Sequence, residues 1–225
     1  MAEITKITEA TETAAPVSAA PAVPELVVKL RKPFEFDGIR HEEIDFSGMA
    51  KLTAADAAEL DENIIMRNDT LPGSMPLSHP YYMQELAGLA SGLPAELFIA
   101  LPIRDMARIS DTLNDNMGRD DNSAPSLKVR LQDGLILNGK KVTELDLTDM
   151  EYFSGVHQQE AERYAKKQPG GRVFQHKSAL RAHQSFHFYL AAKAAGCSPR
   201  ALEALSYRDA IAVRLPVTLF LADII

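Results

Sequence analysis

Two histidines four residues apart, His183 and His187, form the strongest metal-like pattern in this 225-residue chain. That spacing places both imidazoles on one face of a helix, where they could ligate Zn²⁺. The zinc-protease pattern requires a Glu directly after the first His, however, and Gln184 occupies that position. A histidine at the start of a predicted helix more often caps or packs, so we expect a structural role and no metal.

The single cysteine, Cys197, and two acidic pairs are the other candidates for catalysis. A nucleophilic thiol needs a lowered pKa and a nearby base, and no signature of either surrounds Cys197, so we expect an inert thiol. The pairs Glu43/Asp45 and Glu144/Asp146 could be read as carboxylates for general acid–base chemistry. They fall on the polar side of alternating strands, where no burial separates their pKa values. The pattern favours a solvated face, with partner contact as the alternative.

Other catalytic signatures are missing from the sequence. The stretch "KKQPGGR", residues 166–172, lacks the Gly-Lys-Ser/Thr ending of a phosphate loop. Arg104-Asp105 and Arg208-Asp209 each begin a predicted helix, where a local ion pair or an Asp cap explains them. The chain also has no dinucleotide-binding glycine fingerprint and no Gly-x-Ser-x-Gly elbow. The sequence therefore predicts a binding or assembly protein that is not an enzyme and needs no cofactor.

The composition limits the partners. Apolar content of 46% and charged content of 24% are those of a globular protein. The net charge of −7 argues against nucleic-acid binding and favours basic or apolar partners. The most apolar run, residues 215–225, contains Asp223 and is too short to span a membrane. A lone cysteine allows no intramolecular disulfide, which is typical of a reducing cytoplasm.

The elements that must position these residues occur twice. Residues 28–49 align with 129–150, and residues 79–109 align with 183–213. In the second block nine of 31 positions are identical, against roughly two expected from background composition. We therefore interpret the chain as a tandem duplication of one small domain.

Each predicted copy begins with two strands that meet at a turn signal, at residues 37–38 and 138–139. A two-residue turn would place acids and core residues on the same face. A three-residue loop, with its glycine in the left-handed region and a bulge, places the apolar residues together, so we predict that loop. The predicted pairs are Leu30 with Ile44, Val28 with Phe46, Leu131 with Leu145 and Val129 with Leu147.

Helical patterns follow each hairpin. The first helix of each copy begins at a cap, Thr53 or Ser154, and a later one ends at Gly92 or Gly196. Strands followed by helices predict the α+β class. The start of the chain lacks a hydrophobic period and is predicted to be disordered, with a short helix over 2–14 as the alternative. The predicted organisation is a tail at 1–24, a first copy at 25–113, a linker at 114–126 and a second copy at 127–225.

The last predicted helix, residues 208–225, is more apolar than a small domain needs, whereas its counterpart at 104–117 is polar. Pro216 is expected to bend or restart it. Two roles stay open: the helix packs between the copies, or part of it forms a docking surface. The predicted partner-binding residues are Leu215, Val217, Phe220, Leu221, Ile224 and Ile225.

The segments "VVKLRKPFEFDGIRHEEIDFSGM" (27–49) and "LTAADAAELDENI" (52–64) resemble the opening of the tail assembly chaperones of contractile-tailed, Mu-like bacteriophages. The shared layout is a strand, a Pro, a strand, an Asp-Gly turn, a motif like Glu-Leu-Asp-Leu and then helices. The resemblance covers residues 27 to about 113. The second copy is similar but has Gly134 at the place of Pro33, and the family members are shorter, single-domain proteins.

The resemblance implies a non-catalytic chaperone that binds the phage tape-measure protein and keeps it soluble while the tail tube assembles. It implies a location in the host cytoplasm, absence from the mature virion, and the tail tube protein as a further partner. The rival interpretation is a structural tail or baseplate component that stays in the particle. Two copies could bind two segments of one target, or could pack together as an internal pseudo-dimer.

Overall fold

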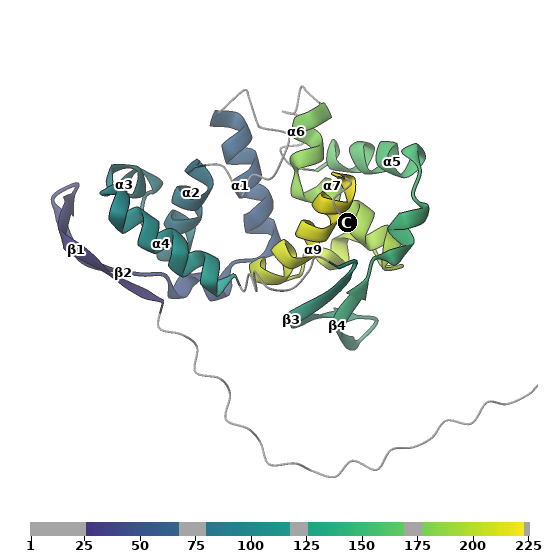
Figure 1. The fold of residues 1–225 in the computed structure, drawn as a ribbon, viewed down its shortest axis with the longest axis horizontal. Helices are drawn as coiled ribbons and strands as arrows, with labels where there is room; N and C mark the ends of the chain where they lie inside the picture. The colour runs from purple at the N-terminus through teal and green to yellow at the C-terminus, as the bar shows by residue number, and fades with distance from the viewer. Residues whose placement is uncertain (1–25, 68–79, 118–125, 169–176, 223–225) are drawn as a thin grey trace, which may run out of the picture.

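The computed structural model describes residues 26–67, 80–117, 126–168 and 177–222 (Figure 1). The chain in these ranges forms two halves, each with one two-stranded antiparallel hairpin followed by helices. The predicted α+β class is confirmed. The predicted tail at 1–24 and most of the predicted linker lie outside the described residues. Among the described residues, no helix has the length and apolar content to cross a membrane.

Within the described residues, the two halves have their elements in the same order, and the short helix α6 of the second half has its counterpart position at residues outside that range. The first half contains β1 (Val27–Phe36), β2 (Ile39–Asp45), the 3-10 helix η1 (Ser47–Lys51), α1 (Ala54–Arg67), α2 (Pro80–Ser91), α3 (Ala95–Ala100) and α4 (Ile103–Asn116). The second half contains β3 (Lys128–Leu137), β4 (Lys140–Asp146), η3 (Thr148–Tyr152), α5 (Gly155–Ala165), α6 (Lys177–Ala182), α7 (Gln184–Ala194), α8 (Pro199–Leu202) and α9 (Tyr207–Leu221). Helix α4 thus runs three residues into the segment predicted as a linker from 114.

The hairpin turns correct the predicted loop. Phe36 pairs with Ile39, so the loop has two residues, and both Asp37 (φ 50°) and Gly38 (φ 76°) are left-handed. Two consecutive positive φ values are the signature of a type I′ turn, which matches the twist of the flanking strands. The prediction of a positive φ at the turn glycine is confirmed, and the three-residue loop is wrong. The second hairpin repeats the arrangement at residues 137–140.

An irregular bulge in the first strand of each hairpin brings the apolar residues back to the predicted face. Strand β1 has three more residues between Lys29 and Phe34 than β2 has between their partners. The register beyond the bulge pairs Val28 with Ile44, two residues away from the predicted pairing of Leu30 with Ile44. In the second hairpin Val129 pairs with Leu145 where Leu131 was predicted. Of the predicted apolar face, the strand residues Val28, Ile44, Val129, Leu131 and Leu145 are buried and Leu30 is half-buried; Leu135 is also buried.

Helix ends follow the predicted signals. The Thr53 N–H and hydroxyl both donate to Asp56 Oδ2 at 2.7 Å, which fixes the start of α1. The Ser154 N–H donates to His157 Nδ1 at 3.0 Å before α5. Gly92 (φ +71°) follows α2, and Gly196 (φ +66°) follows α7. These left-handed glycines end their helices as predicted.

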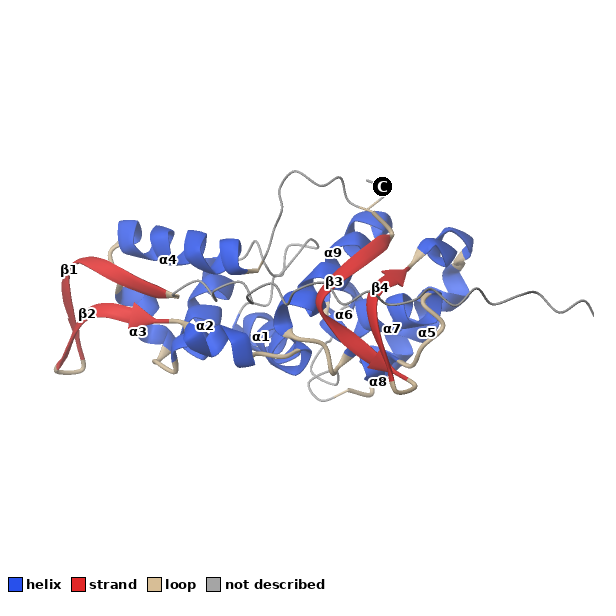
Figure 2. Ribbon diagram, turned by 90° about the horizontal axis from the view of Figure 1, so that it is seen from below, coloured by secondary structure: helices blue, strands red, loops and turns tan. Residues whose placement is uncertain are grey.

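Each half has its own hydrophobic core, and a few residues cross between them (Figure 2). Figure 2 shows the two hairpins over separate groups of helices. Ala54, at the start of α1, belongs to the core of the second half. Tyr207 and Ile211, on α9, belong to the core of the first half. Helix α1 accordingly lies between the other helices of the first half and those of the second (Figure 1).

Candidate binding groove between the two halves

The two histidines fill structural positions. The His183 Nδ1 accepts the Ser185 N–H at 3.2 Å and so caps α7, as predicted. The His183 Nε2 lies 3.3 Å from Glu62 Oε1 on α1. The His187 Nδ1 lies 3.1 Å from the carbonyl oxygen of His183. In the part of the chain that the structure describes, no group of three His, Cys, Asp or Glu side chains could hold a metal ion.

Burial decides the protonation of two candidate groups. Burial, together with the positive charge of Arg214, lowers the pKa of His187 to about 3, so the imidazole is neutral at pH 7. Burial raises the pKa of the half-buried Cys197 thiol, so the reactive thiolate is disfavoured. Neither group is tuned for acid–base or nucleophilic work near neutral pH.

The acidic pairs are exposed, as the strand pattern predicts. Asp45 Oδ1 accepts the Ser47 N–H at 2.7 Å, and Asp146 Oδ1 accepts the Thr148 N–H at 3.0 Å. Each carboxylate thus fixes the entry into a 3-10 helix. Hydrogen bonds from Thr148 lower the pKa of Asp146. These carboxylates organise local backbone, and their exposure leaves them in contact with water.

The aspartates of the two Arg-Asp pairs hold the hairpins on the helices. Asp209, fully buried at the start of α9, accepts the N–H groups of Gln132, Asp133 and Gly134 at 2.7, 3.0 and 3.1 Å. Asp105, at the start of α4, accepts the Arg31 N–H at 3.0 Å. Each carboxylate therefore satisfies backbone donors that the strand bulge leaves without a cross-strand partner. Sequence reasoning placed a cap or ion pair here but missed the contact with the distant hairpin.

The two halves join through unlike elements. The Ala54 N–H donates to the Leu205 carbonyl at 3.0 Å, and the Tyr207 N–H donates to the Leu52 carbonyl at 2.9 Å. This short antiparallel bridge sets α1 against α7 and α9. Helix α5, the counterpart of α1, instead packs on α6 and α7 of its own half. The contact is therefore not the symmetric arrangement of an isologous pseudo-dimer.

A buried ion pair lies behind this bridge. Arg214 Nη1 on α9 lies 2.9 Å from Asp61 Oδ1 on α1, and both side chains are at most 2% exposed. Arg214 also donates to Gln184 Oε1 at 3.3 Å and to the Ala182 carbonyl. The Gln184 N–H donates to Asp61 Oδ2 at 2.9 Å. Burial raises the pKa of Asp61, and the positive charge of Arg214 opposes that rise.

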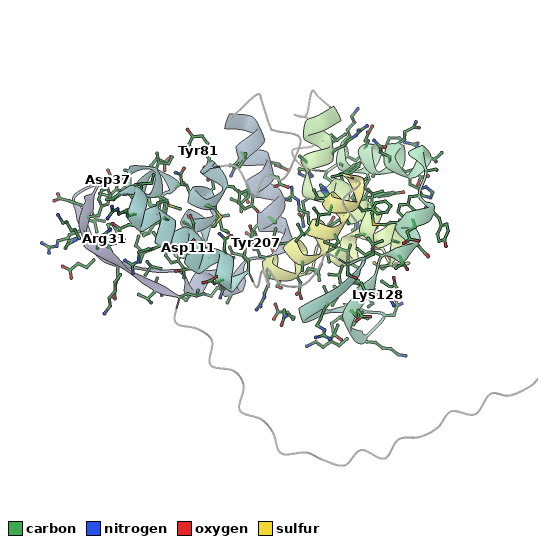
Figure 3. The ribbon with its side chains drawn as sticks, in the orientation of Figure 1. Arg31, Asp37, Tyr81, Asp111, Lys128 and Tyr207 are labelled. Atoms are coloured by element: carbon green, nitrogen blue, oxygen red, sulfur yellow. The ribbon has the colours of Figure 1, made fainter. Side chains whose placement is uncertain are left out.

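A pair of tyrosines completes the contact. The hydroxyl groups of Tyr82 on α2 and Tyr207 on α9 lie 2.5 Å apart and are buried. Burial raises the pKa of both phenols, which keeps them neutral. Figure 3 shows Tyr207 at the start of α9, between the helices of the two halves. Sequence reasoning missed this cluster, although Arg214 interrupts an apolar run, which is the one signal available for it; Asp61 stands among other polar residues.

A groove of about 820 Å³ lies beside the ion pair, between α1 on one side and α7 and α8 on the other. Its floor includes the buried Ala54 and Phe188. Its rim carries polar side chains that reach solvent. The groove is lined by Ala54, Ala55, Ala58, Glu59, Glu62, Asn63, Gln168, His183, Gln184, Ser185, Phe188, Arg200 and Glu203. This arrangement has the features of a binding surface: an apolar floor and a charged rim.

The residues predicted to bind a partner occupy different environments. Val217 is fully buried in the second core, which contradicts its assignment to an open docking surface. The half-buried Phe220 packs against the same core, and Leu215 is also half-buried. Leu221 is 46% exposed. Ile224 and Ile225 lie outside the described residues. Most of α9 thus serves the packing role that the sequence left open.

The comparisons with known proteins add no relatives. No protein-family model, no curated protein and no solved structure matches this chain.

Proposed function

We propose that this chain is a tail assembly chaperone of a contractile-tailed, Mu-like phage, which binds the tape-measure protein and keeps it soluble while the tail tube assembles. The observation that carries the proposal is the resemblance of residues 27 to about 113 to that family. In this role the protein acts in the host cytoplasm, has no catalytic activity, and leaves the tail before it is complete.

The proposal includes a tandem duplication, which repeated structural details support. The two halves share their order of elements, and both hairpins turn on a left-handed pair of residues. Asp105 and Asp209, aligned in the sequence, both accept N–H groups from the hairpin of their own half. Two unrelated domains with a similar fold would not need an aspartate at the same place, bonded to the hairpin in the same way. The shared aspartate therefore favours a common origin of the two halves.

The groove between the halves suits a chaperone of a helical client. A long apolar client aggregates unless its hydrophobic surface is covered, and a helix in a groove buries such a surface without a deep pocket. The groove requires both halves, because α1 forms one wall and α7 with α8 forms the other. A single-domain member of the family would have to form such a wall with another subunit.

Co-expression tests the proposal. The gene beside this one is expected to encode a long helical protein, which should be insoluble alone, and soluble and co-purified with this chain. Purified particles should lack this chain. Its presence in particles in fixed amount would support the rival assignment, a structural tail or baseplate component. Failure to solubilise the long helical protein, with the chain folded, would refute the chaperone role.

A further inference from the structure

We infer that the groove between α1 and α7–α8 binds a cationic amphipathic helix, whose Lys or Arg side chains lie against its carboxylates. The inference deepens the proposed function, on which it rests for the identity of the natural partner. The chemistry of the site can be tested without that partner.

Charge is the first observation. The described lining carries three carboxylates, Glu59, Glu62 and Glu203, and one guanidinium, Arg200. Asp61 lies directly behind the wall and is already paired with Arg214. The rim is therefore acidic, and basic side chains of a partner would find carboxylates on both walls.

The shape of α1 is the second observation. The lining residues of α1 run from Ala54 to Asn63, about 14 Å at 1.5 Å per residue. That length corresponds to roughly two and a half helical turns. Ala55 and Ala58 present only methyl groups along this wall, so another helix can approach closely. The elongated, small-residue wall matches a helix better than a compact ligand.

An unused hydrogen-bond donor is the third observation, independent of the charges. Gln184 lines the groove, is 1% exposed, and uses its Oε1 to accept from Arg214. Among the described residues, its Nε2 has no hydrogen-bond partner. A buried donor without an acceptor is costly, so a carbonyl oxygen of the partner that reaches this wall would be stabilising.

The negative charge of this chain argues against its own first segment, or a second copy of it, as the occupant of the groove. The first 25 residues carry four Glu and one Lys, so this segment has the same sign as the rim. The whole chain has a net charge of −7, which disfavours a second copy in the same way. A separate, positively charged partner is the occupant that complements the groove.

The test uses the full chain and two synthetic helical peptides of about 15 residues, near the minimum length for a helix in water. The peptides share one pattern of Leu and Ala and differ only in carrying Lys or Glu at the remaining positions. Calorimetry should detect binding of the Lys peptide and none of the Glu peptide. Glu59→Lys in the groove should weaken binding of the Lys peptide about tenfold, since it replaces an attraction by a repulsion.

The matched control is Glu96→Lys on α3, an exposed residue outside the groove lining, which makes the same change in net charge. It should leave the affinity within about twofold of wild type, as expected for a screened distant charge. Equal effects of the two variants would overturn the inference, because attraction would then follow net charge alone. If Glu59→Lys fails to fold, Glu203→Lys on the opposite wall replaces it.

Binding experiments with the tape-measure protein distinguish a failure of this inference from a failure of the proposed function. If the Lys peptide binds as described and the tape-measure protein does not co-purify, the groove chemistry holds and the proposed function fails. If the tape-measure protein binds Glu59→Lys as tightly as wild type, the proposed function holds and the groove is not its binding site.

Discussion

A buried carboxylate does the same work in each half at the residue scale. Asp209 accepts three N–H groups of the β3 bulge, and Asp105 accepts one from the β1 bulge. Both sit in the first turn of a helix, where the helix dipole also favours a negative charge. The two residues therefore anchor a two-stranded hairpin that would be marginal by itself.

The difference in hydrogen-bond number predicts a difference in stability. Asp209→Ala should lower the free energy of unfolding by about 3 kcal/mol or more, because three backbone donors lose a charged acceptor. Asp105→Ala should cost about 1–2 kcal/mol, because one donor is affected. Urea denaturation followed by circular dichroism measures both. Equal losses would show that the helix-dipole contribution, not the hairpin contact, dominates.

The neutral state of His187 predicts a pH dependence. The pKa is about 3 in the folded protein, against a usual 6.5. Between these values the unfolded chain binds more protons, so this residue makes stability fall as the pH drops below about 6.5. Above that pH the residue has no such effect. Asp61, whose pKa burial raises, acts with the opposite sign and is unchanged in the comparison below.

His187→Met removes this titration. Between pH 7 and pH 5 the variant should lose about 2 kcal/mol less stability than wild type, from about 1.4 kcal/mol per unit of pKa difference. The His183 carbonyl keeps the Phe186 N–H as a donor, so the substitution leaves it paired. Urea denaturation at both pH values is the measurement. Parallel pH profiles for variant and wild type would contradict the assignment of a neutral His187.

At the element scale, the hairpins show what the sequence can and cannot predict. The strands, the turn glycines and the buried face follow from local turn chemistry and alternation. The register does not, because the extra residues of the bulge are held by Asp105 and Asp209, which lie more than seventy positions away in the chain. A contact of that range leaves no trace in the local pattern. From the local pattern alone, the three-residue loop with its bulge is the simplest arrangement that places Val28 and Ile44 on one face.

Two glycines of the second hairpin separate backbone strain from steric crowding. Gly134 and Gly139 both have a φ of +77°. A Cβ at Gly139 would meet nothing within 4 Å, whereas at Gly134 it would lie 3.0 Å from the Val142 carbonyl oxygen. Gly139→Ala should therefore cost about 1–2 kcal/mol from the left-handed conformation alone. Gly134→Ala should cost more, and thermal unfolding can rank them. A smaller loss at Gly134 would show that the bulge relaxes.

At the scale of the whole molecule, the sequence predicts neither the groove nor the residue pairs that join the halves. The Glu residues on its rim read as an ordinary solvated helix face, because nothing local indicates the opposing wall from α7 and α8. Asp61 and Arg214 are 153 positions apart and become partners only once α1 and α9 pack together. Two roles for the last helix, packing or docking, are open from the sequence alone. Helix α9 contributes residues to both cores, so the structure supports packing for Val217.

The buried ion pair predicts how the halves unfold. Because Ala54, Tyr207 and Ile211 each contribute to the core of the opposite half, we expect wild type to unfold in a single cooperative transition. Arg214→Met leaves the Asp61 carboxylate buried without its cation, which should cost about 3–5 kcal/mol. This loss falls at the contact between the halves, so the variant should unfold in two steps. Circular dichroism and tyrosine absorbance in urea would detect the separation.

The double variant Asp61→Asn with Arg214→Met removes the unpaired charge and should recover part of the loss. If the double variant is no more stable than Arg214→Met alone, the cost lies in lost packing around the guanidinium, and the ion pair is not what couples the halves.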